Sequence, residues 1–104
     1  MQYPVDSYLP DIAQSLLSHS GVLLKAEPGA GKTTQVPLYL LRHFQRILVV
    51  EPRRLAAKLS AEWVAQQSGG TVGGLIGYQI RLDSRKSKDT RLLYITEGIL
   101  TRLF

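Results

Sequence analysis

The sequence predicts an α/β fold in three layers, with a mostly parallel sheet. Three short apolar runs, at 22–24, 47–50 and 92–95, have the length and composition of buried strands. Segments whose apolar residues recur at helical spacing lie between and after these runs, and Gly or Pro marks many of the boundaries. Strands that alternate with helices of about ten residues or more are typical of layered α/β domains.

Length and composition narrow the class of protein. With 104 residues the chain holds one domain, and its 44% apolar content is ordinary for a globular protein. No apolar run approaches the ~18 residues of a membrane span, so we expect no membrane partner. The absence of cysteine excludes disulfides and thiolate metal sites, and we expect a cytoplasmic location. A net charge of +5 favours a polyanionic partner, although a solvated surface can have the same surplus.

The first half of the chain should contain two helices and one strand. Residues 1–20 are expected to be a lead-in followed by a helix, because Pro10 suits a first helical turn and apolar residues then recur at helical spacing. The first strand should span 22–25. The next helix should run from about 32 to 43, and Pro37 should bend it because proline removes one backbone hydrogen bond.

The second half continues the alternation of strands and helices. Ser68 and two glycines stop one helical pattern, and Thr96 suits the N-cap of the last helix. The elements expected are a strand at 47–50, a helix at 53–67, a short strand at 78–82, a polar charged loop at 83–90, a strand at 92–95, and a helix at 96–104.

Residues 26–34, AEPGAGKTT, connect the first strand to a helix and predict a phosphate-binding loop, with Ala26 where the usual pattern has glycine. Glycines leave no Cβ between the backbone and a ligand, so that successive N–H groups can point at an anion. Lys32 would reach the β- and γ-phosphates of ATP, and Thr33 would bind Mg²⁺; both would act in catalysis. The alternative is a glycine-rich turn that only caps a helix. The expected nucleotide-binding residues are Gly29, Ala30, Gly31, Lys32, Thr33 and Thr34.

Two further segments leave a strand at the same edge of the expected sheet. Arg53 and Arg54 begin the helix after the second strand, whereas Thr96 begins the last helix and Arg102 lies further along it. Helix N-termini, hydroxyl groups and guanidinium groups bind phosphodiester backbones. These four residues are therefore candidates for nucleic-acid binding. The alternatives are surface charge or ion pairing with a nearby glutamate for the arginines, and a plain helix cap for Thr96.

Four blocks make the sequence resemble the start of a DEAH-box helicase of superfamily two, most closely the bacterial HrpB type. The blocks occur in the order and at the spacing of that family, and they cover essentially the whole chain. They are GAGKTTQVPL at 29–38, EPRRLAA at 51–57, VGGLIGYQIRLDS at 72–84 and TEGILTR at 96–102.

The resemblance implies that residues 1–104 are the N-terminal part of the first RecA-like, P-loop domain of an ATP-dependent helicase acting on single-stranded RNA. It assigns motif I to residues 29–34, motif Ia to Arg53 and Arg54, and motif Ib to Thr96 and Arg102. The DEAH carboxylates, and the arginine fingers of a second RecA-like domain in the same longer chain, are not within residues 1–104. We therefore predict that this piece alone binds nucleotide weakly and does not hydrolyse it.

The resemblance has two structural consequences. The strands before motif I and motif Ia should not be neighbours, so a sheet built from residues 1–104 alone should have a gap and exposed edges. Trp63 occupies the position at which related helicases carry an arginine that stacks on adenine, and an indole could also stack. However, Leu55, Leu59 and Trp63 recur at intervals of four, which also describes a buried stripe, so both interpretations stay open.

Two rival functions are considered. A small P-loop nucleotide kinase or phosphotransferase would leave the PRR and TEGILTR blocks unexplained. A non-catalytic, basic nucleic-acid-binding module would use the loop only to grip phosphates. A cluster of basic residues near 81–91 fits either a nucleic-acid contact or a solvated loop; its members are Arg81, Arg85, Lys86, Lys88 and Arg91.

Overall fold

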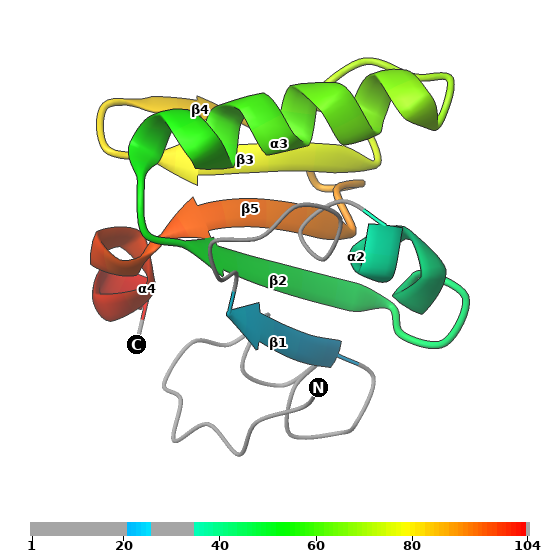
Figure 1. The fold of residues 1–104 in the computed structure, drawn as a ribbon, viewed down its shortest axis with the longest axis horizontal. Helices are drawn as coiled ribbons and strands as arrows, with labels where there is room; N and C mark the ends of the chain where they lie inside the picture. Colours follow the sequence, from blue (N-terminus) through cyan, green and yellow to red (C-terminus); the bar gives the residue numbers. More distant parts are fainter. Residues whose placement is uncertain (1–20, 26–34, 104) are drawn as a thin grey trace.

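The computed structural model describes residues 21–25 and 35–103, and in these residues the chain forms one five-stranded sheet (Figure 1). The strand order is β1-β2-β5-β3-β4; the first four strands in this order are parallel to one another, and β4 is antiparallel to β3. The predicted α/β class with a mostly parallel sheet is confirmed. The strands are β1 (Gly21–Lys25), β2 (Arg46–Glu51), β3 (Ile76–Ile80), β4 (Asp83–Arg85) and β5 (Leu92–Thr96).

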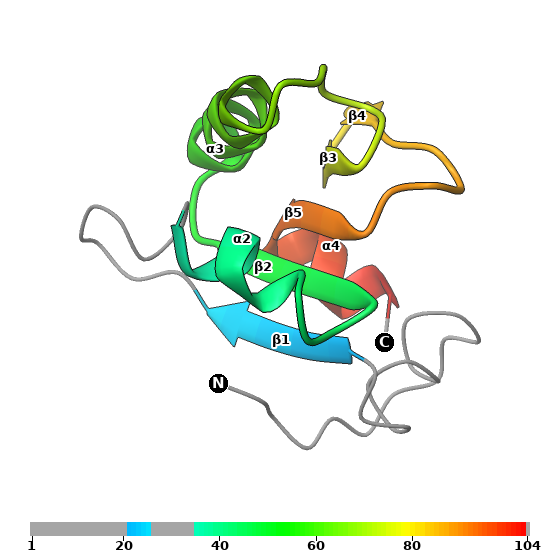
Figure 2. The same cartoon turned by 90° about the vertical axis from the view of Figure 1, so that its right-hand side faces the viewer.

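Helices cover both faces of the sheet (Figure 2). Two of them, α2 (Gln35–Leu40) and α3 (Arg54–Gln67), lie on one face, and α4 (Glu97–Leu103) lies on the other. The arrangement gives the three layers that the sequence predicts. In the part of the chain that the structure describes, no helix is long and apolar enough to span a bilayer.

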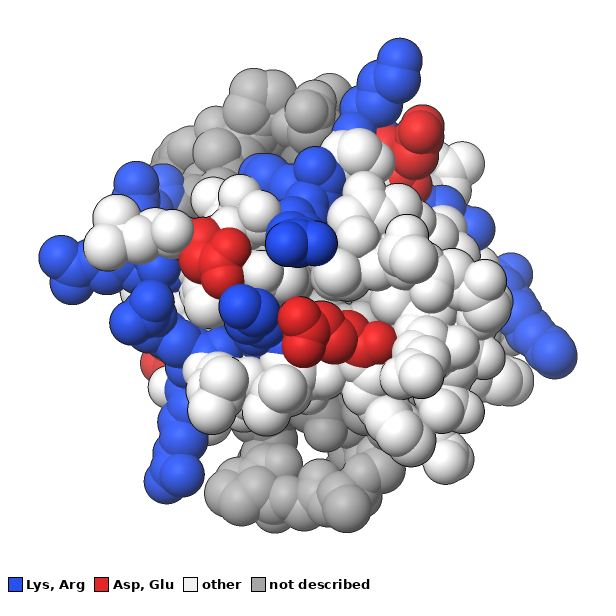
Figure 3. Space-filling view, turned by 90° about the horizontal axis from the view of Figure 1, so that it is seen from above, with Lys and Arg blue, Asp and Glu red and all other residues white. Residues whose placement is uncertain are grey.

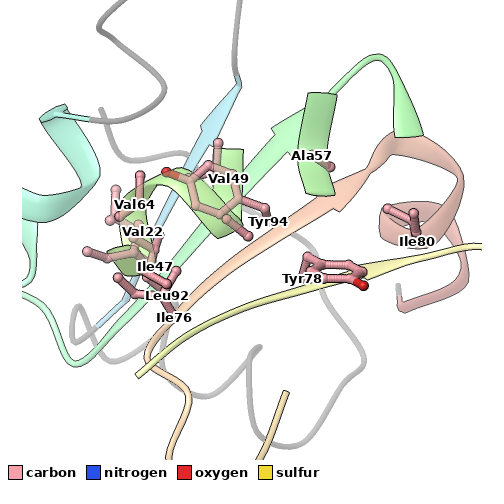
Figure 4. Packing of buried hydrophobic residues seen from close by; sticks show 12 residues of the cluster. Val22, Ile47, Val49, Ala57, Val64, Ile76, Tyr78, Ile80, Leu92 and Tyr94 are labelled. Atoms are coloured by element: carbon pink, nitrogen blue, oxygen red, sulfur yellow. The ribbon is translucent and has the colours of Figure 1, made fainter. Parts of the chain in front are cut away.

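Alternation along the strands divides the core into two clusters, because successive side chains point to opposite faces. Nearly complete burial of aliphatic and aromatic side chains on both faces is the main source of stability, at about 1.5–3 kcal/mol for each large side chain. Figure 4 shows the larger cluster, under α2 and α3, which includes Val22, Ile47, Val49, Ile76, Tyr78, Leu92 and Tyr94. The smaller cluster, under α4, consists of Leu23, Leu48, Val50, Leu93, Ile95 and Ile99.

Most expected elements are present, with shifted ends. The expected strand at 78–82 lies at Ile76–Ile80, because its pairing with β5 begins at Ile76. The expected polar loop at 83–90 is partly wrong, since its first three residues form β4 and pair with β3. The helix expected to reach residue 43 ends at Leu40, after which single turns continue to Phe44. The helix expected within residues 1–20 lies outside the described residues.

The expected gap beside β1 is wrong for this structure. β1 pairs with β2 along its whole length, with Gly21 opposite Arg46 and Lys25 opposite Val50. Backbone N–H and C=O groups of a buried strand require partners, and the apolar flank of β2 supplies both hydrogen bonds and packing. β1 and β4 are therefore the two outermost strands of the described sheet.

The outer surface of α3 contradicts the interpretation of its four-residue repeat as a core stripe. The side chains of Leu55, Leu59 and Trp63 are 64%, 52% and 54% exposed. Helix α3 instead packs through small residues on its opposite side, which let it lie close to the sheet. These buried residues are Ala57, Ala61, Val64 and Ala65.

Arg91 connects α2 to β5 at the edge where the parallel strands begin. Its guanidinium group donates hydrogen bonds to the carbonyl oxygens of Leu41 at 2.7 Å, Phe44 at 2.7 Å and Gln45 at 3.0 Å. Carbonyl groups at the end of a helix lack intrahelical partners, and a cation is favourable there. Arg91, which the sequence places in a basic loop, therefore has a structural role.

Candidate nucleotide and nucleic-acid interface

The carboxyl ends of the parallel strands lie at one edge of the sheet, where the arrowheads of β1, β2, β5 and β3 point in Figure 1. The ends of neighbouring strands are aligned: Lys25 of β1 lies opposite Val50 of β2, and Glu51 of β2 lies opposite Thr96 of β5. In open α/β sheets, ligands bind outside these ends. The loop after β1, helix α3 after β2 and helix α4 after β5 therefore start from adjacent positions. We call this the carboxyl edge.

The loop that should bind nucleotide lies outside the described residues. Residues 29–34, including Lys32 and Thr33, follow the end of β1 after a few residues, so the described strand leads into the carboxyl edge. Their contacts with ATP and Mg²⁺ stay predictions. Among the described residues, no three His, Asp or Glu side chains form a group that could hold a metal ion.

Arg53 is the N-cap residue of α3 and is exposed. Its backbone is extended, with φ −124° and ψ 139°, and its side chain makes no hydrogen bond to the helix end. The first turn of α3 has no acidic residue, whereas Arg53 and Arg54 place positive charge at the positive end of the helix dipole. This arrangement is unfavourable without an anion and favours binding of a phosphate group.

Unlike the side chain of Arg53, the side chain of Arg54 contacts another element of the fold within the described residues. Its Nη2 atom donates a hydrogen bond to the carbonyl oxygen of Arg81 at 3.1 Å, in the turn between β3 and β4. The ion pairs with a glutamate that the sequence left open are not seen for either arginine in the described part of the chain. Arg54 therefore connects two structural elements, and the two arginines of the PRR block have different surroundings.

Thr96 and Glu51 are cross-strand neighbours buried at the carboxyl edge, with exposures of 8% and 5%. Among the described residues, the Oε2 atom of Glu51 has no hydrogen-bond partner. Burial raises the pKa of Glu51, and a hydrogen bond with Ser60 opposes part of that rise. Burial also raises the pKa of Tyr94, and the charge of Glu51 adds to it. A buried unpaired carboxylate oxygen is rare in native proteins, which marks this edge as unusual.

Arg102 is exposed in the last turn of α4. Because α4 and α3 lie on opposite faces of the sheet (Figure 2), the structure does not bring Arg102 beside Arg53. Both helices nevertheless begin at the carboxyl edge, where Glu51 at the end of β2 lies opposite Thr96 at the end of β5.

Sequence reasoning underrated Arg81 and did not single out Glu51. Arg81 directly follows β3, so the sheet places it at the carboxyl edge rather than in a uniform basic loop. In Figure 3, lysine and arginine side chains gather on the left, the side toward which the parallel strands end. The signal for Glu51 was present in the sequence: a glutamate that directly follows four apolar residues of a buried strand.

The fold matches solved helicase structures, while no family model matches the chain. The crystal structure of the Escherichia coli DExH-box NTPase HrpB aligns with a TM-score of 0.67 and 40% identity, over 88% of this chain and 12% of that chain. A crystal structure of the Escherichia coli DEAH/RHA helicase HrpB aligns with a TM-score of 0.66 and 41% identity, over 89% of this chain and 12% of that one.

Sequence comparison gives related proteins in several organisms. The ATP-dependent RNA helicase HrpB of Escherichia coli K12 is 41% identical over 103 residues, which cover 96% of this chain and 13% of the relative. The human ATP-dependent RNA helicase TDRD9 is 37% identical over 103 residues, which cover 93% of this chain and 8% of the relative. The probable ATP-dependent RNA helicase spindle-E of Culex quinquefasciatus is 42% identical over 103 residues, which cover 93% of this chain and 7% of the relative.

Fold and carboxyl edge together define part of a RecA-like domain of the P-loop class. The chain spans only between 7% and 13% of the length of these relatives. Within that span, its sequence and fold fit a segment of a DEAH-box RNA helicase of the HrpB type, and the predicted resemblance is confirmed.

Proposed function

We propose that this chain is the ATP- and RNA-binding segment of an ATP-dependent RNA helicase, in which hydrolysis drives movement along a single strand. The observation that carries the proposal is the parallel register of β1, β2 and β5, which starts residues 26–34, α3 and α4 from adjacent positions. A nucleotide and a nucleic-acid strand that contact neighbouring segments can influence each other's binding. The names of the relatives support ATP as the nucleotide and RNA as the strand.

One group of residues would bind the nucleotide and another would bind the nucleic-acid strand. Residues 29–34 would hold the phosphates, with Lys32 on the β- and γ-phosphates and the Thr33 hydroxyl on Mg²⁺. Arg53 and the free N–H groups of α3 would hold the phosphodiester backbone, with Thr96 and Arg102 contributing from the segment after β5. The carboxylates and arginine fingers that complete hydrolysis would come from beyond residues 1–104, including a second RecA-like domain.

Trp63 is proposed to contact the adenine base. Its exposed indole on α3 is free to stack, unlike a core residue. Because the chain contains one tryptophan, its fluorescence reports directly on this contact. Quenching by ATP that is lost in Lys32→Ala would support the contact, and an emission spectrum insensitive to saturating ATP would contradict it.

The central test measures the affinity of the full-length protein for a single-stranded RNA by fluorescence anisotropy, with and without a non-hydrolysable ATP analogue and Mg²⁺. We expect the nucleotide to change RNA affinity in the wild type and to have no effect in Lys32→Ala, which should still bind RNA without nucleotide. Equal affinities under all conditions would favour the non-catalytic nucleic-acid-binding module. Phosphoryl transfer to a small acceptor without RNA would favour the kinase.

The 104-residue chain offers a second test. It is expected to bind nucleotide weakly and to show no single-turnover ATP hydrolysis, either with or without RNA, because the acidic groups that hold Mg²⁺ and position water are missing. RNA-stimulated hydrolysis by this chain alone would contradict the division of catalytic groups proposed above.

A further inference from the structure

The first turns of α3 are fastened to the turn between β3 and β4 by a group of polar contacts. Arg54 donates to the carbonyl oxygen of Arg81 at 3.1 Å. Lys58 Nζ lies 3.2 Å from Asp83 Oδ2, and the Tyr78 hydroxyl lies 3.1 Å from each carboxylate oxygen of Asp83. Lys58 Nζ also lies 5.8 Å from the centre of the Tyr78 ring. We call these five residues the α3–hairpin clasp.

The turn between β3 and β4 contains a strained residue, which both the clasp and the β3–β4 pairing enclose. Leu82 has φ 67°, the left-handed region that costs a residue with a Cβ about 1–2 kcal/mol. Its side chain is 93% exposed, so packing does not repay that cost. The residues on either side of it, Arg81 and Asp83, are both held by the clasp. A strained residue persists only where its surroundings determine the backbone.

The charges of the clasp support one another near neutral pH. The hydrogen bond to Asp83 raises the pKa of Lys58. Partial desolvation tends to raise the pKa of Asp83, but the hydrogen bonds from Lys58 and Tyr78 outweigh it, so the pKa of Asp83 is lowered. An isolated exposed ion pair contributes little to stability. Here the hydroxyl of the buried Tyr78 also bonds Asp83, so the main effect of the pair is to fix the position of α3 relative to the turn.

We propose that Asp83 is a positioning residue for nucleic-acid binding, because through the clasp it fixes the first turns of α3 and so aims Arg53 at the bound strand. The inference rests on the proposed function. It assigns different tasks to the two neighbouring arginines: Arg54 holds the helix to the hairpin, and Arg53, at the exposed N-cap, contacts the phosphate. Asp83 itself touches no ligand.

The sign of one substitution separates this role from simple electrostatics. Asp83→Asn removes a negative charge from a protein that binds a polyanion, so charge alone predicts tighter RNA binding. Positioning through the clasp predicts weaker binding. Asp89→Asn is the matched control, since it makes the same charge change at an exposed residue outside the clasp, and it should leave RNA affinity unchanged or slightly increased.

A double-mutant cycle tests the connection to Arg53. We would measure the affinity of the full-length protein for a labelled single-stranded oligouridylate at fixed salt. Arg53→Gln should weaken binding about tenfold in the wild type and only about two- to threefold in the Asp83→Asn background, because the guanidinium is no longer aimed there. The slope of log affinity against log salt should fall by about one for Arg53→Gln in the wild type.

The combined exchange Lys58→Asp with Asp83→Lys should restore the affinity that Asp83→Asn loses, because the pair is re-formed with reversed charge. It also serves if Asp83→Asn folds poorly. Equal losses on Arg53→Gln in both backgrounds would overturn the positioning role while leaving the proposed function intact. No loss on Arg53→Gln in the wild type would instead remove Arg53 from the RNA interface, and the positioning role with it.

Discussion

The two ends of the parallel sheet treat their polar groups differently. Where the strands begin, Arg91 donates to three carbonyl oxygens around the end of α2, and the Thr90 hydroxyl donates to the carbonyl oxygen of Gly74 at 2.6 Å. Where the strands end, Glu51 Oε2 has no partner among residues 21–25 and 35–103, and Arg53 is exposed at a helix end that lacks a side-chain cap. In the described part of the chain, Arg91 and Thr90 thus have internal partners where the strands begin, whereas Glu51 Oε2 and the Arg53 side chain do not have them where the strands end.

This contrast separates stability from binding. Hydrogen bonds that a protein satisfies internally contribute to folding, whereas groups held without partners are available to a ligand and carry a cost until it binds. Substitutions at the two ends should therefore have opposite signatures. Substitutions where the strands begin should lower stability without changing the RNA affinity of the folded molecules. Substitutions at the carboxyl edge should change RNA affinity without lowering stability.

The largest effect is expected at the satisfied end. Arg91→Ala should lower the free energy of unfolding by about 3 kcal/mol, because three carbonyl groups lose a charged donor. Urea unfolding at constant m-value measures the change. Arg91→Lys should recover only part of it, since an ammonium group lacks the planar fork that reaches several acceptors. A loss below about 0.5 kcal/mol would show that this end is no more stabilising than an ordinary surface.

At the carboxyl edge, Arg53→Gln should have the opposite profile. RNA affinity should fall about tenfold, while the free energy of unfolding stays within about 0.5 kcal/mol of the wild-type value, because Arg53 is exposed and caps nothing with its side chain. Anisotropy and urea unfolding on the same samples make the comparison. A stability loss as large as that of Arg91→Ala would erase the distinction between the two ends.

Glu51→Gln should stabilise the protein at pH 7 by about 1 kcal/mol, because it removes a buried charge whose Oε2 atom has no partner among the described residues. Burial raises the folded pKa of Glu51 above its ordinary value of 4.5, so the folded state holds the proton more tightly. Wild-type stability should thus fall as pH rises from about 4.5 through the raised pKa, and the difference from the variant should vanish below about pH 4. A constant difference across this range would contradict the cause.

The smallest effect concerns the pH range of the α3–hairpin clasp. The pKa of Asp83 is lowered, so its contribution is present above its ordinary value of 3.8 and is lost as pH falls through the folded pKa. The pKa of Lys58 is raised, so its contribution is present below 10.5 and is lost as pH rises through the folded pKa. Wild type and Asp83→Asn should therefore converge in stability at low pH, measured by urea unfolding. A difference that persists in acid would exclude the charged pair as its source.

Local patterns predicted most of the described elements and the segments that begin at the carboxyl edge. The strand at 47–50 was visible because a strand buried on both faces is continuously apolar, and the positions of Arg53 and Thr96 followed from where strands end. The roles of individual side chains were less accessible. Arg54 and Arg53 are adjacent and chemically identical, but the side chain of Arg54 contacts a carbonyl group 27 residues away.

Spacing along the chain was enough to predict the α/β class, the alternation of strands and helices, and the order of the four blocks that resemble a helicase. Tertiary structure alone decided that β1 pairs with β2, that the Leu55–Leu59–Trp63 stripe faces outward, and that Arg91 serves the end of α2. The physical reason is that pairing, burial and hydrogen-bond partners are set by residues distant in sequence, which compete for the same surfaces once the chain has folded.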